Sequence, residues 1–202
     1  MPSPDACFEP LTGVARASIA EGHRTGAPLE VDLERFDPAL RVRGASFVTL
    51  HIGDALRGCT GSLEPVRPLV ADVAHQAFNA AFRDPRFEPL REGEHAHLRV
   101  HVSILGPRER LSVSSEDELL ATLRPGVDGL VLEEGDLRAT FLPAVWAQLP
   151  SPREFLQQLR LKAGLPVGYW SRSLRVSRYT VQDVEDQERS SSPRSERTMS
   201  RS

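Results

Sequence analysis

Six consecutive residues, 56–61, combine the side chains with the greatest chemical potential in this sequence. The segment Leu56-Arg57-Gly58-Cys59-Thr60-Gly61 contains a cation, a thiol, a hydroxyl and two glycines. In an extended segment, residues two apart project from the same face, so Arg57 would lie roughly 6–7 Å from Cys59. A guanidinium at that distance favours the thiolate, the nucleophilic form of cysteine. The spacing therefore makes Cys59 a candidate nucleophile, with Arg57 holding the thiolate or an anionic substrate group.

The two glycines of this segment leave its backbone bare. A ligand or a second segment of the chain could therefore approach the backbone at Gly58 and Gly61. The same residues also allow a simpler interpretation, because free cysteine often behaves as a small, inert and buried hydrophobic residue. The sequence leaves both a functional and a structural Cys59 open.

A rigid turn downstream supplies two more charged candidates. Asp84 and Arg86 flank Pro85. They can pair with each other or with Arg57, which would be a structural role. Alternatively, they can set the geometry of a ligand, since arginine binds carboxylate or phosphate through two parallel hydrogen bonds.

Histidines offer routes for proton transfer. His75 falls among small residues in a predicted helix, where it either faces Cys59 as a base or lies partly exposed on the surface; His51 is the other candidate. A predicted strand further on alternates, and its polar face carries His95, His97, Arg99, His101 and Ser103. Three imidazoles would suit a transition metal, but Arg99 in the middle of the row would repel a cation. We therefore expect a solvated face and no metal site.

Lys162 is the only lysine in the chain. A lysine can lose its proton when buried, which an arginine does not do. Lys162 also precedes Gly164 at the end of a predicted helix, where a cation suits the helix dipole. We favour this structural interpretation.

Several ordered motifs resemble one family. Leu56–Gly61 is similar to the signature of the AMMECR domain family, whose bacterial and archaeal members are called AmmeMemoRadiSam system protein A; the usual motif has isoleucine at the position of Thr60. Further similar segments are Asp84-Pro85-Arg86-Phe87, Ser103-Ile104-Leu105, Gly126-Val127-Asp128-Gly129, Thr140-Phe141-Leu142-Pro143 with Val145-Trp146, and Phe155-Leu156 leading to Lys162-Ala163-Gly164. The resemblance extends from about Phe8 to Val181.

The resemblance implies an α+β fold with a larger and a smaller lobe and with the cysteine motif near the cleft between them. It directs attention to substrate-binding candidates, namely Arg57, Gly58, Thr60, Gly61, Arg86 and Thr140. The name of the family records an association with a Memo-like protein and a radical S-adenosylmethionine protein, which are therefore the expected partners. We expect no cofactor, and the three clustered cysteines that an iron–sulfur site needs are absent from the sequence.

The elements that must position these residues follow from hydrophobic periodicity and turn signals. The first predicted helix, with Phe8, Leu11, Ala15 and Ile19 on one face, ends at Gly22. Strands are predicted at 45–54, 57–63, 95–104, 129–132, 137–141 and 174–181, and helices follow Pro68, Ser115 and Ser151. These elements lack a regular β-α-β rhythm, so we expect a mainly antiparallel sheet flanked by helices. Residues 1–181 form the expected domain, and 182–202 a disordered polar tail.

Composition limits the classes of function. The net charge is −3 and the pI is near 6.1, which argues against tight nonspecific binding of nucleic acid while leaving a local basic patch open. No apolar run reaches the length of a membrane span, and neither a secretory signal nor a disulfide framework is recognisable, so we expect a cytoplasmic protein. Two hypotheses remain: an enzyme or enzyme subunit that uses Cys59, His75 and Asp84, or a non-catalytic binding module for a protein, nucleotide or RNA.

Overall fold

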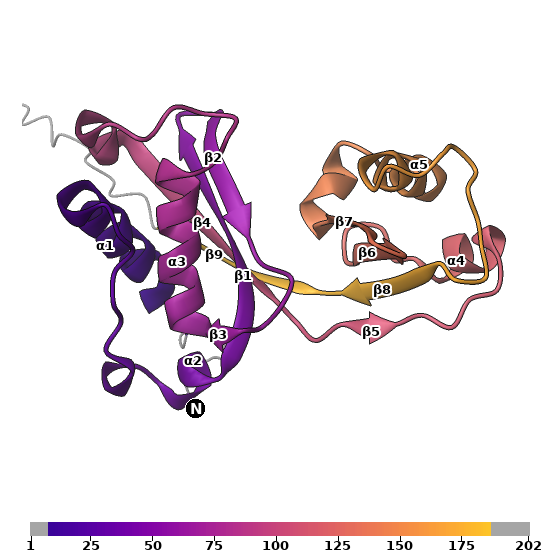
Figure 1. Ribbon diagram of the computed structural model, residues 1–202, viewed down its shortest axis with the longest axis horizontal. Coiled ribbons are helices and arrows are strands. Elements are labelled where there is room, and N and C mark those ends of the chain that lie inside the picture. Colours follow the sequence, from indigo (N-terminus) through magenta and orange to yellow (C-terminus); the bar gives the residue numbers. More distant parts are fainter. Residues whose placement is uncertain (1–7, 187–202) are drawn as a thin grey trace, which may run out of the picture.

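The computed structural model describes residues 8–186, which form two lobes (Figure 1). The larger lobe comprises residues 8–105 and 181–186. Its elements are α1 (Pro10–Thr25), η2 (Leu33–Arg35), α2 (Pro38–Arg41), β1 (Arg43–Ile52), β2 (Ala55–Gly61), β3 (Arg67–Pro68), α3 (Leu69–Phe82), η3 (Glu92–His97), β4 (Leu98–Leu105) and β9 (Val181–Glu185). The smaller lobe, residues 106–180, is therefore inserted between two neighbouring strands of the larger one.

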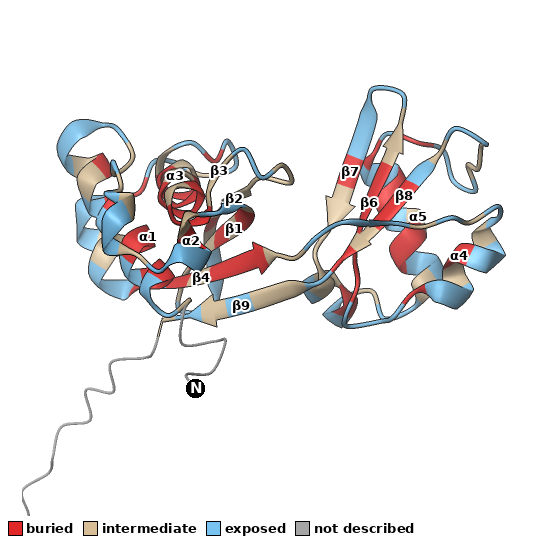
Figure 2. Cartoon of the chain, turned by 90° about the horizontal axis from the view of Figure 1, so that it is seen from below, coloured by how far each residue is buried: buried red, intermediate tan, exposed pale blue. Residues whose placement is uncertain are grey.

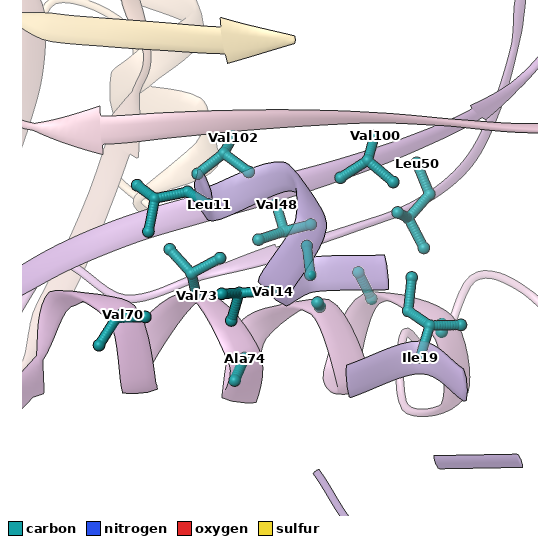
Figure 3. Close-up of a cluster of buried hydrophobic side chains, with 14 of the residues drawn as sticks. Leu11, Val14, Ile19, Val48, Leu50, Val70, Val73, Ala74, Val100 and Val102 are labelled. Carbon is teal, nitrogen blue, oxygen red and sulfur yellow. The ribbon is translucent and has the colours of Figure 1, made fainter. Parts of the chain in front are cut away.

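The sheet of the larger lobe is antiparallel, with strand order β2-β1-β4-β9 and with β3 added beside β1. Helices α1 and α3 cover one face of this sheet (Figure 1). Aliphatic side chains of β1 and β4, such as Val48 and Val102, interdigitate there with Leu11 of α1 and Val73 of α3, and all four are fully buried (Figure 3). Burying this face is the main stabilising contribution to the lobe, and it leaves the other face to polar side chains.

The smaller lobe has its own sheet and core. Its elements are β5 (Glu109–Arg110), α4 (Glu116–Thr122), β6 (Gly129–Glu134), β7 (Leu137–Phe141), η4 (Pro143–Ala147), α5 (Pro152–Lys162) and β8 (Arg175–Tyr179), and the strand order is β5-β8-β6-β7. Trp146 stacks on Phe155 with ring centroids 3.8 Å apart and donates to the Asp128 carbonyl at 2.7 Å. Figure 2 shows a buried core segment in each lobe, so each lobe packs around a centre of its own.

Two chain segments connect the lobes side by side. The N–H of Gly106 donates to the Thr180 carbonyl at 2.9 Å where both segments cross between the sheets. Next to this crossing, the Glu64 carboxylate of the larger lobe pairs with Arg108 at 2.9 Å and with Arg138 of β7 at 2.7 Å. The Glu64–Arg138 pair therefore ties the loop after β2 directly to the smaller lobe.

The predicted fold class is confirmed, and most elements lie where the periodicity placed them. The side chains of Ser115 and Ser151 accept hydrogen bonds from backbone N–H groups at the starts of α4 and α5, as the capping patterns predict. The first helix, however, continues past Gly22 and ends before Gly26, which adopts φ 74°. Gly22 is needed for packing instead, since a Cβ there would lie 2.3 Å from the Phe82 ring.

Two further predictions differ from the structure for topological reasons. The last predicted strand is split into β8 and β9, because the chain leaves the smaller lobe at Thr180 and joins the larger one. Residues 182–185, assigned to the tail from sequence, form β9, and residues 187–202 lie outside the described part of the chain. His95 and His97 belong to η3 and not to β4, because the Glu94 carboxylate accepts the Arg91 N–H at 2.7 Å and closes that turn.

Within residues 8–186, no helix has both the length and the apolar character needed to cross a membrane.

Candidate functional site

Cys59 lies on β2, on the polar face of the larger sheet. Its backbone is paired with Thr49 of β1, and the Thr49 hydroxyl donates to the Cys59 sulfur at 3.3 Å. The neighbouring residues Gly58 and Thr60 contact α3 on the other side of the sheet, so alternation along the strand directs Cys59 away from the helices. The residue is half-buried, and the sulfur is therefore not sealed in the aliphatic core.

The turn at Asp84-Pro85-Arg86 holds the backbone of Cys59 on the outer edge of β2. One oxygen of the Asp84 carboxylate accepts the Cys59 N–H at 2.8 Å, and the Arg86 guanidinium donates to the Cys59 carbonyl at 3.2 Å. Asp84 and Arg86 also bond to each other at 2.7 and 2.9 Å. The two side chains thus satisfy an edge strand as a neighbouring strand would, and they fix the position of the thiol.

Asp84 is an ionised anchor rather than a proton acceptor. Its side chain is 3% exposed, and the hydrogen bonds from Arg86, together with those from the backbone of Cys59 and Arg86, hold its pKa far below the usual range. A carboxylate with so low a pKa does not take up a proton near neutral pH. We therefore assign Asp84 a role in positioning Cys59 and not in proton transfer.

Arg57 does not lie beside the thiol as simple alternation predicts. The pairing of β1 with β2 shifts between Leu50 and His51, leaving Arg57 at a β-bulge. The bulge turns its side chain to Glu94, whose carboxylate receives two hydrogen bonds at 2.8 and 3.0 Å, and to the Glu88 carbonyl at 2.9 Å. This pairing lowers the pKa of Glu94 to about 2. Arg57 therefore ties β2 to the 88–94 loop.

Gly58, Thr60 and Gly61 of the motif pack against other parts of the protein. A Cβ on Gly58 would lie 2.1 Å from the Ala80 carbonyl oxygen of α3, and one on Gly61 would lie 2.2 Å from the Phe47 ring. The Thr60 hydroxyl donates to the Gln76 carbonyl of α3 at 2.8 Å. The bare backbone could have been approached by a ligand or by a second segment of the chain. In the structure, a second segment of the chain approaches it.

The histidines are distant from this arrangement. His75 lies on α3, on the opposite side of the sheet from Cys59, where burial and the nearby charge of Arg67 lower its pKa. His51 lies on β1 in a group with Arg99 and His101, and burial and these two neighbours lower its pKa. The structure thus brings neither histidine to the Cys59 thiol.

His101 is held by the last strand of the larger sheet. Its two ring nitrogens lie 2.8 Å from the Asp183 carboxylate and 2.7 Å from that of Glu185, both on β9. The hydrogen bonds that the ring donates to the carboxylates of Asp183 and Glu185 raise the pKa of His101, which burial opposes. Across residues 8–186, His, Cys, Asp and Glu side chains form no group of three or more that could hold a metal ion.

A cavity of about 470 Å³ lies between the lobes. We call it the interlobe cavity, and its walls are Phe47, Gly61, Ser62, Leu63 and Glu64 of the larger lobe with Arg138, Ala139, Thr140 and Lys162 of the smaller. Phe47 of β1 pairs with Gly61 of β2, and Thr49 pairs with Cys59 two residues further along the same strands. Cys59 is not one of these wall residues, but its side chain projects from the same face of the sheet as Phe47, two residues before Gly61 on β2.

Lys162 is the member of this site that sequence analysis assigned to a structural role. Its Nζ donates to the Thr140 carbonyl at 3.0 Å and lies 5.0 Å from the centroid of the Phe141 ring. The residue is exposed as a whole, but its amino group is partly surrounded by the smaller lobe, and this desolvation lowers its pKa; Cys59 has the opposite effect, raising that pKa. Its uniqueness as the only lysine was the signal available in the sequence.

Fold and site together define a two-lobed α+β protein with a clamped cysteine at the edge of an interlobe cavity. The sequence profile of the AMMECR1 family matches residues 12–184. The chain belongs to the AMMECR1 family.

Relatives and a solved structure agree with this assignment. A protein of Methanothermobacter thermautotrophicus is 38% identical over 174 residues, covering 85% of this chain and 90% of that protein. Protein MJ0810 of Methanocaldococcus jannaschii is 35% identical, with 86% and 87% covered. The crystal structure of the uncharacterised protein PH0010 from Pyrococcus horikoshii matches with a TM-score of 0.83 and 32% identity, covering 90% of this chain and 92% of that one. The names of these proteins state no reaction.

Proposed function

We propose that this AMMECR1-family protein is an enzyme or an enzyme's subunit in which Cys59 acts as nucleophile or covalent carrier. The observation that carries the proposal is the anchored backbone of Cys59, whose side chain projects from the same face of the sheet as Phe47 in the wall of the interlobe cavity. Asp84 and Arg86 hold the Cys59 backbone through hydrogen bonds of 2.8 and 3.2 Å. A structural cysteine needs no such clamp, whereas a nucleophile must be held in one orientation toward its substrate.

The charges around the thiol support the same role. Arg86 and Lys162 approach Cys59 from different lobes; Arg86 is paired with Asp84, whereas the interaction with Cys59 raises the pKa of Lys162 against the larger lowering by desolvation. Reactive cysteines are typically found beside a lysine, arginine or histidine cation. Lys162 thus replaces Arg57 as the cation proposed to act on the thiol or on an anionic substrate group. Asp84 and Arg86 remain the residues proposed to position Cys59.

The proposed setting is a modification pathway shared with a Memo-like protein and a radical S-adenosylmethionine protein. This part rests on family resemblance, and we place the protein in the cytoplasm, where thiols are kept reduced. Co-purification of the full chain with either protein class would support the association. If this protein, the Memo-like protein and the radical S-adenosylmethionine protein did not associate when mixed in purified form at micromolar concentrations, a stable complex would be contradicted.

The labelling rate of Cys59 tests the enzymatic proposal. In the full chain with Cys7→Ser, iodoacetamide should alkylate native Cys59 at pH 7 faster than it alkylates the same thiol in the urea-unfolded chain. The reason is that Lys162 is brought near the thiol only in the folded state, and a neighbouring cation makes a cysteine more reactive. Labelling that becomes appreciable only on unfolding would overturn the proposal.

One observation favours a second candidate, a non-catalytic binding or regulatory module. Within the motif, Gly58, Thr60 and Gly61 are all occupied by contacts with α3 or with the Phe47 ring. The motif would then build the lobe, and a protein, nucleotide or RNA would dock at the cleft. Slow native labelling combined with saturable, salt-sensitive binding of RNA would favour this module over the enzyme.

A further inference from the structure

Lys162 faces the interlobe cavity without a carboxylate partner. Its polar contact is the Thr140 carbonyl, which engages one of the three donors of an ammonium group. Among the residues that the structure describes, no acidic side chain forms an ion pair with Lys162, and Glu64, the carboxylate in the cavity wall, is already bound to Arg108 and Arg138. The ammonium group is therefore the uncompensated charge of the cavity.

The other cations near the cavity are neutralised by the protein. Arg138 is paired with Glu64 at 2.7 Å and with Glu133 at 3.3 Å. Arg86 is paired with Asp84 at 2.7 Å. An oxyanion entering the cavity would therefore meet Lys162 as the cation with free donors, in a partly desolvated position where a charge pair is stronger than in water.

The location of Lys162 orients such an anion toward the thiol. Lys162 ends α5 in the smaller lobe, while Gly61 and Ser62 form the facing wall in the larger lobe. Cys59 precedes Gly61 by two residues on the same face of β2. A small molecule bound to Lys162 through one end therefore presents its remaining atoms to the Cys59 sulfur, and a cavity of about 470 Å³ is of the size that ligands occupy.

We infer that the interlobe cavity binds a small substrate bearing an oxyanion group, a carboxylate or a phosphate, and that Lys162 binds this group while Cys59 faces the rest of the molecule. This inference rests on the proposed role of Cys59. It adds that neither lobe has the complete site, because the thiol and its anion-binding cation come from different lobes.

The selectivity of alkylation tests the inference. Iodoacetate and iodoacetamide form the same C–S bond with a thiolate and release iodide, but only iodoacetate carries a carboxylate. In the full chain with Cys7→Ser, the ratio of the iodoacetate rate to the iodoacetamide rate should be about 5–10-fold higher in the native than in the urea-unfolded protein, since one favourable charge contact of this kind changes a rate by such a factor. An unchanged ratio would overturn the inference.

Variants assign the effect to Lys162. Lys162→Met should bring the ratio to within about twofold of the unfolded value, and Lys162→Arg should keep it high. The matched control is Arg110→Gln, which removes one positive charge from β5 at the opposite edge of the smaller sheet from β7. A fall in the ratio with Arg110→Gln as large as with Lys162→Met would contradict a local site.

Competition distinguishes the two oxyanions. At constant ionic strength, acetate or inorganic phosphate should slow iodoacetamide labelling of native Cys59, and the more effective anion identifies the group. Protection by neither would count against the site. Failure of the anion site differs measurably from failure of the proposed function: fast iodoacetamide labelling with an unchanged ratio rejects only the anion site, whereas slow native labelling rejects a reactive Cys59.

Discussion

The carboxylate of Asp84 accepts a 2.8 Å hydrogen bond from the backbone N–H of Cys59, although 25 residues separate the two in sequence. The same carboxylate binds Arg86, which returns a hydrogen bond to the carbonyl of Cys59. The position of the Cys59 backbone is therefore fixed by a turn at the end of α3 and not by β2 alone. This relationship makes the Asp84-Pro85-Arg86 turn part of the site.

Replacing Asp84 tests this clamp. Asp84→Asn should lower the free energy of unfolding at pH 7 by about 2–3 kcal/mol, because it removes charge-assisted hydrogen bonds from a buried carboxylate. Urea unfolding measures the loss. The matched control is Asp54→Asn, since the fully exposed Asp54 side chain lies 3.6 Å from Arg99 and should contribute little. Equal effects of both substitutions would contradict the clamp.

The contribution of Asp84 should also depend on pH. Because the folded-state pKa of Asp84 is depressed, its stabilising effect is present above the unfolded pKa of about 3.9 and is lost as the pH falls toward the folded value. The difference in unfolding free energy between the native chain and Asp84→Asn should therefore shrink between pH 6 and pH 3. If this difference in unfolding free energy grew on acidification, the pKa of Asp84 would not be depressed in the folded state.

Gly58 should tolerate no side chain. Gly58→Ala places a Cβ 2.1 Å from the Ala80 carbonyl oxygen, so β2 and α3 must separate, and we expect a loss of about 2–3 kcal/mol in urea unfolding. Gly93→Ala is the control, because no heavy atom outside its chain neighbours lies within 4 Å of that Cβ position. A near-neutral Gly58→Ala would mean that the close approach of strand and helix is relaxed in solution.

His101 should stabilise the larger lobe more in acid than in base. Its pKa is raised by the hydrogen bonds that it donates to Asp183 and Glu185, so its contribution is complete below the unfolded pKa of about 6.5 and is lost as the pH rises through the folded value. His101→Gln should therefore destabilise the protein more at pH 6 than at pH 9, as thermal unfolding can measure. His97→Gln, an exposed residue of η3, provides the comparison, and an effect independent of pH would exclude this role for His101.

The junction between the lobes offers another prediction. Glu64→Gln should weaken the pairs with Arg108 and Arg138 while changing thermal stability little, since these side chains are partly exposed. Hydrogen exchange of the Gly106 amide, which is bonded to Thr180 between the lobes, should accelerate several-fold. Glu21→Gln, which affects only a pair within α1, is the control. Unchanged exchange at Gly106 would show that Glu64 does not restrain the lobes.

Local chemistry predicted much of the fold. Ser115 and Ser151 gave the starts of two helices, and the Asp84-Pro85 pair gave the end of a third, because capping and proline effects act within a few residues. The direction of Arg57 could not be predicted, since the β-bulge depends on how β2 pairs with β1. The role of Gly22 likewise depends on where Phe82 of a distant helix packs.

The site shows the same limit. Sequence spacing identified Cys59, Asp84 and Arg86, which the structure brings together. It could not bring Lys162 to them, because Cys59 and Lys162 are 103 positions apart in sequence and belong to different lobes. The sequence also could not show that His75 lies on the opposite side of the sheet from Cys59, because that depends on how α3 packs against the sheet.

The most direct test of the account is a cross-link between Cys59 and Lys162. In the Cys7→Ser chain, these are the only thiol and the only side-chain amine, so a short thiol–amine reagent can join them in one way, and peptide mass spectrometry identifies the product. The account predicts an internal Cys59–Lys162 cross-link in the native protein that is lost in urea. A native protein whose Cys59 resists the reagent, or whose bound reagent reaches only the N-terminal amine, would contradict a shared cavity.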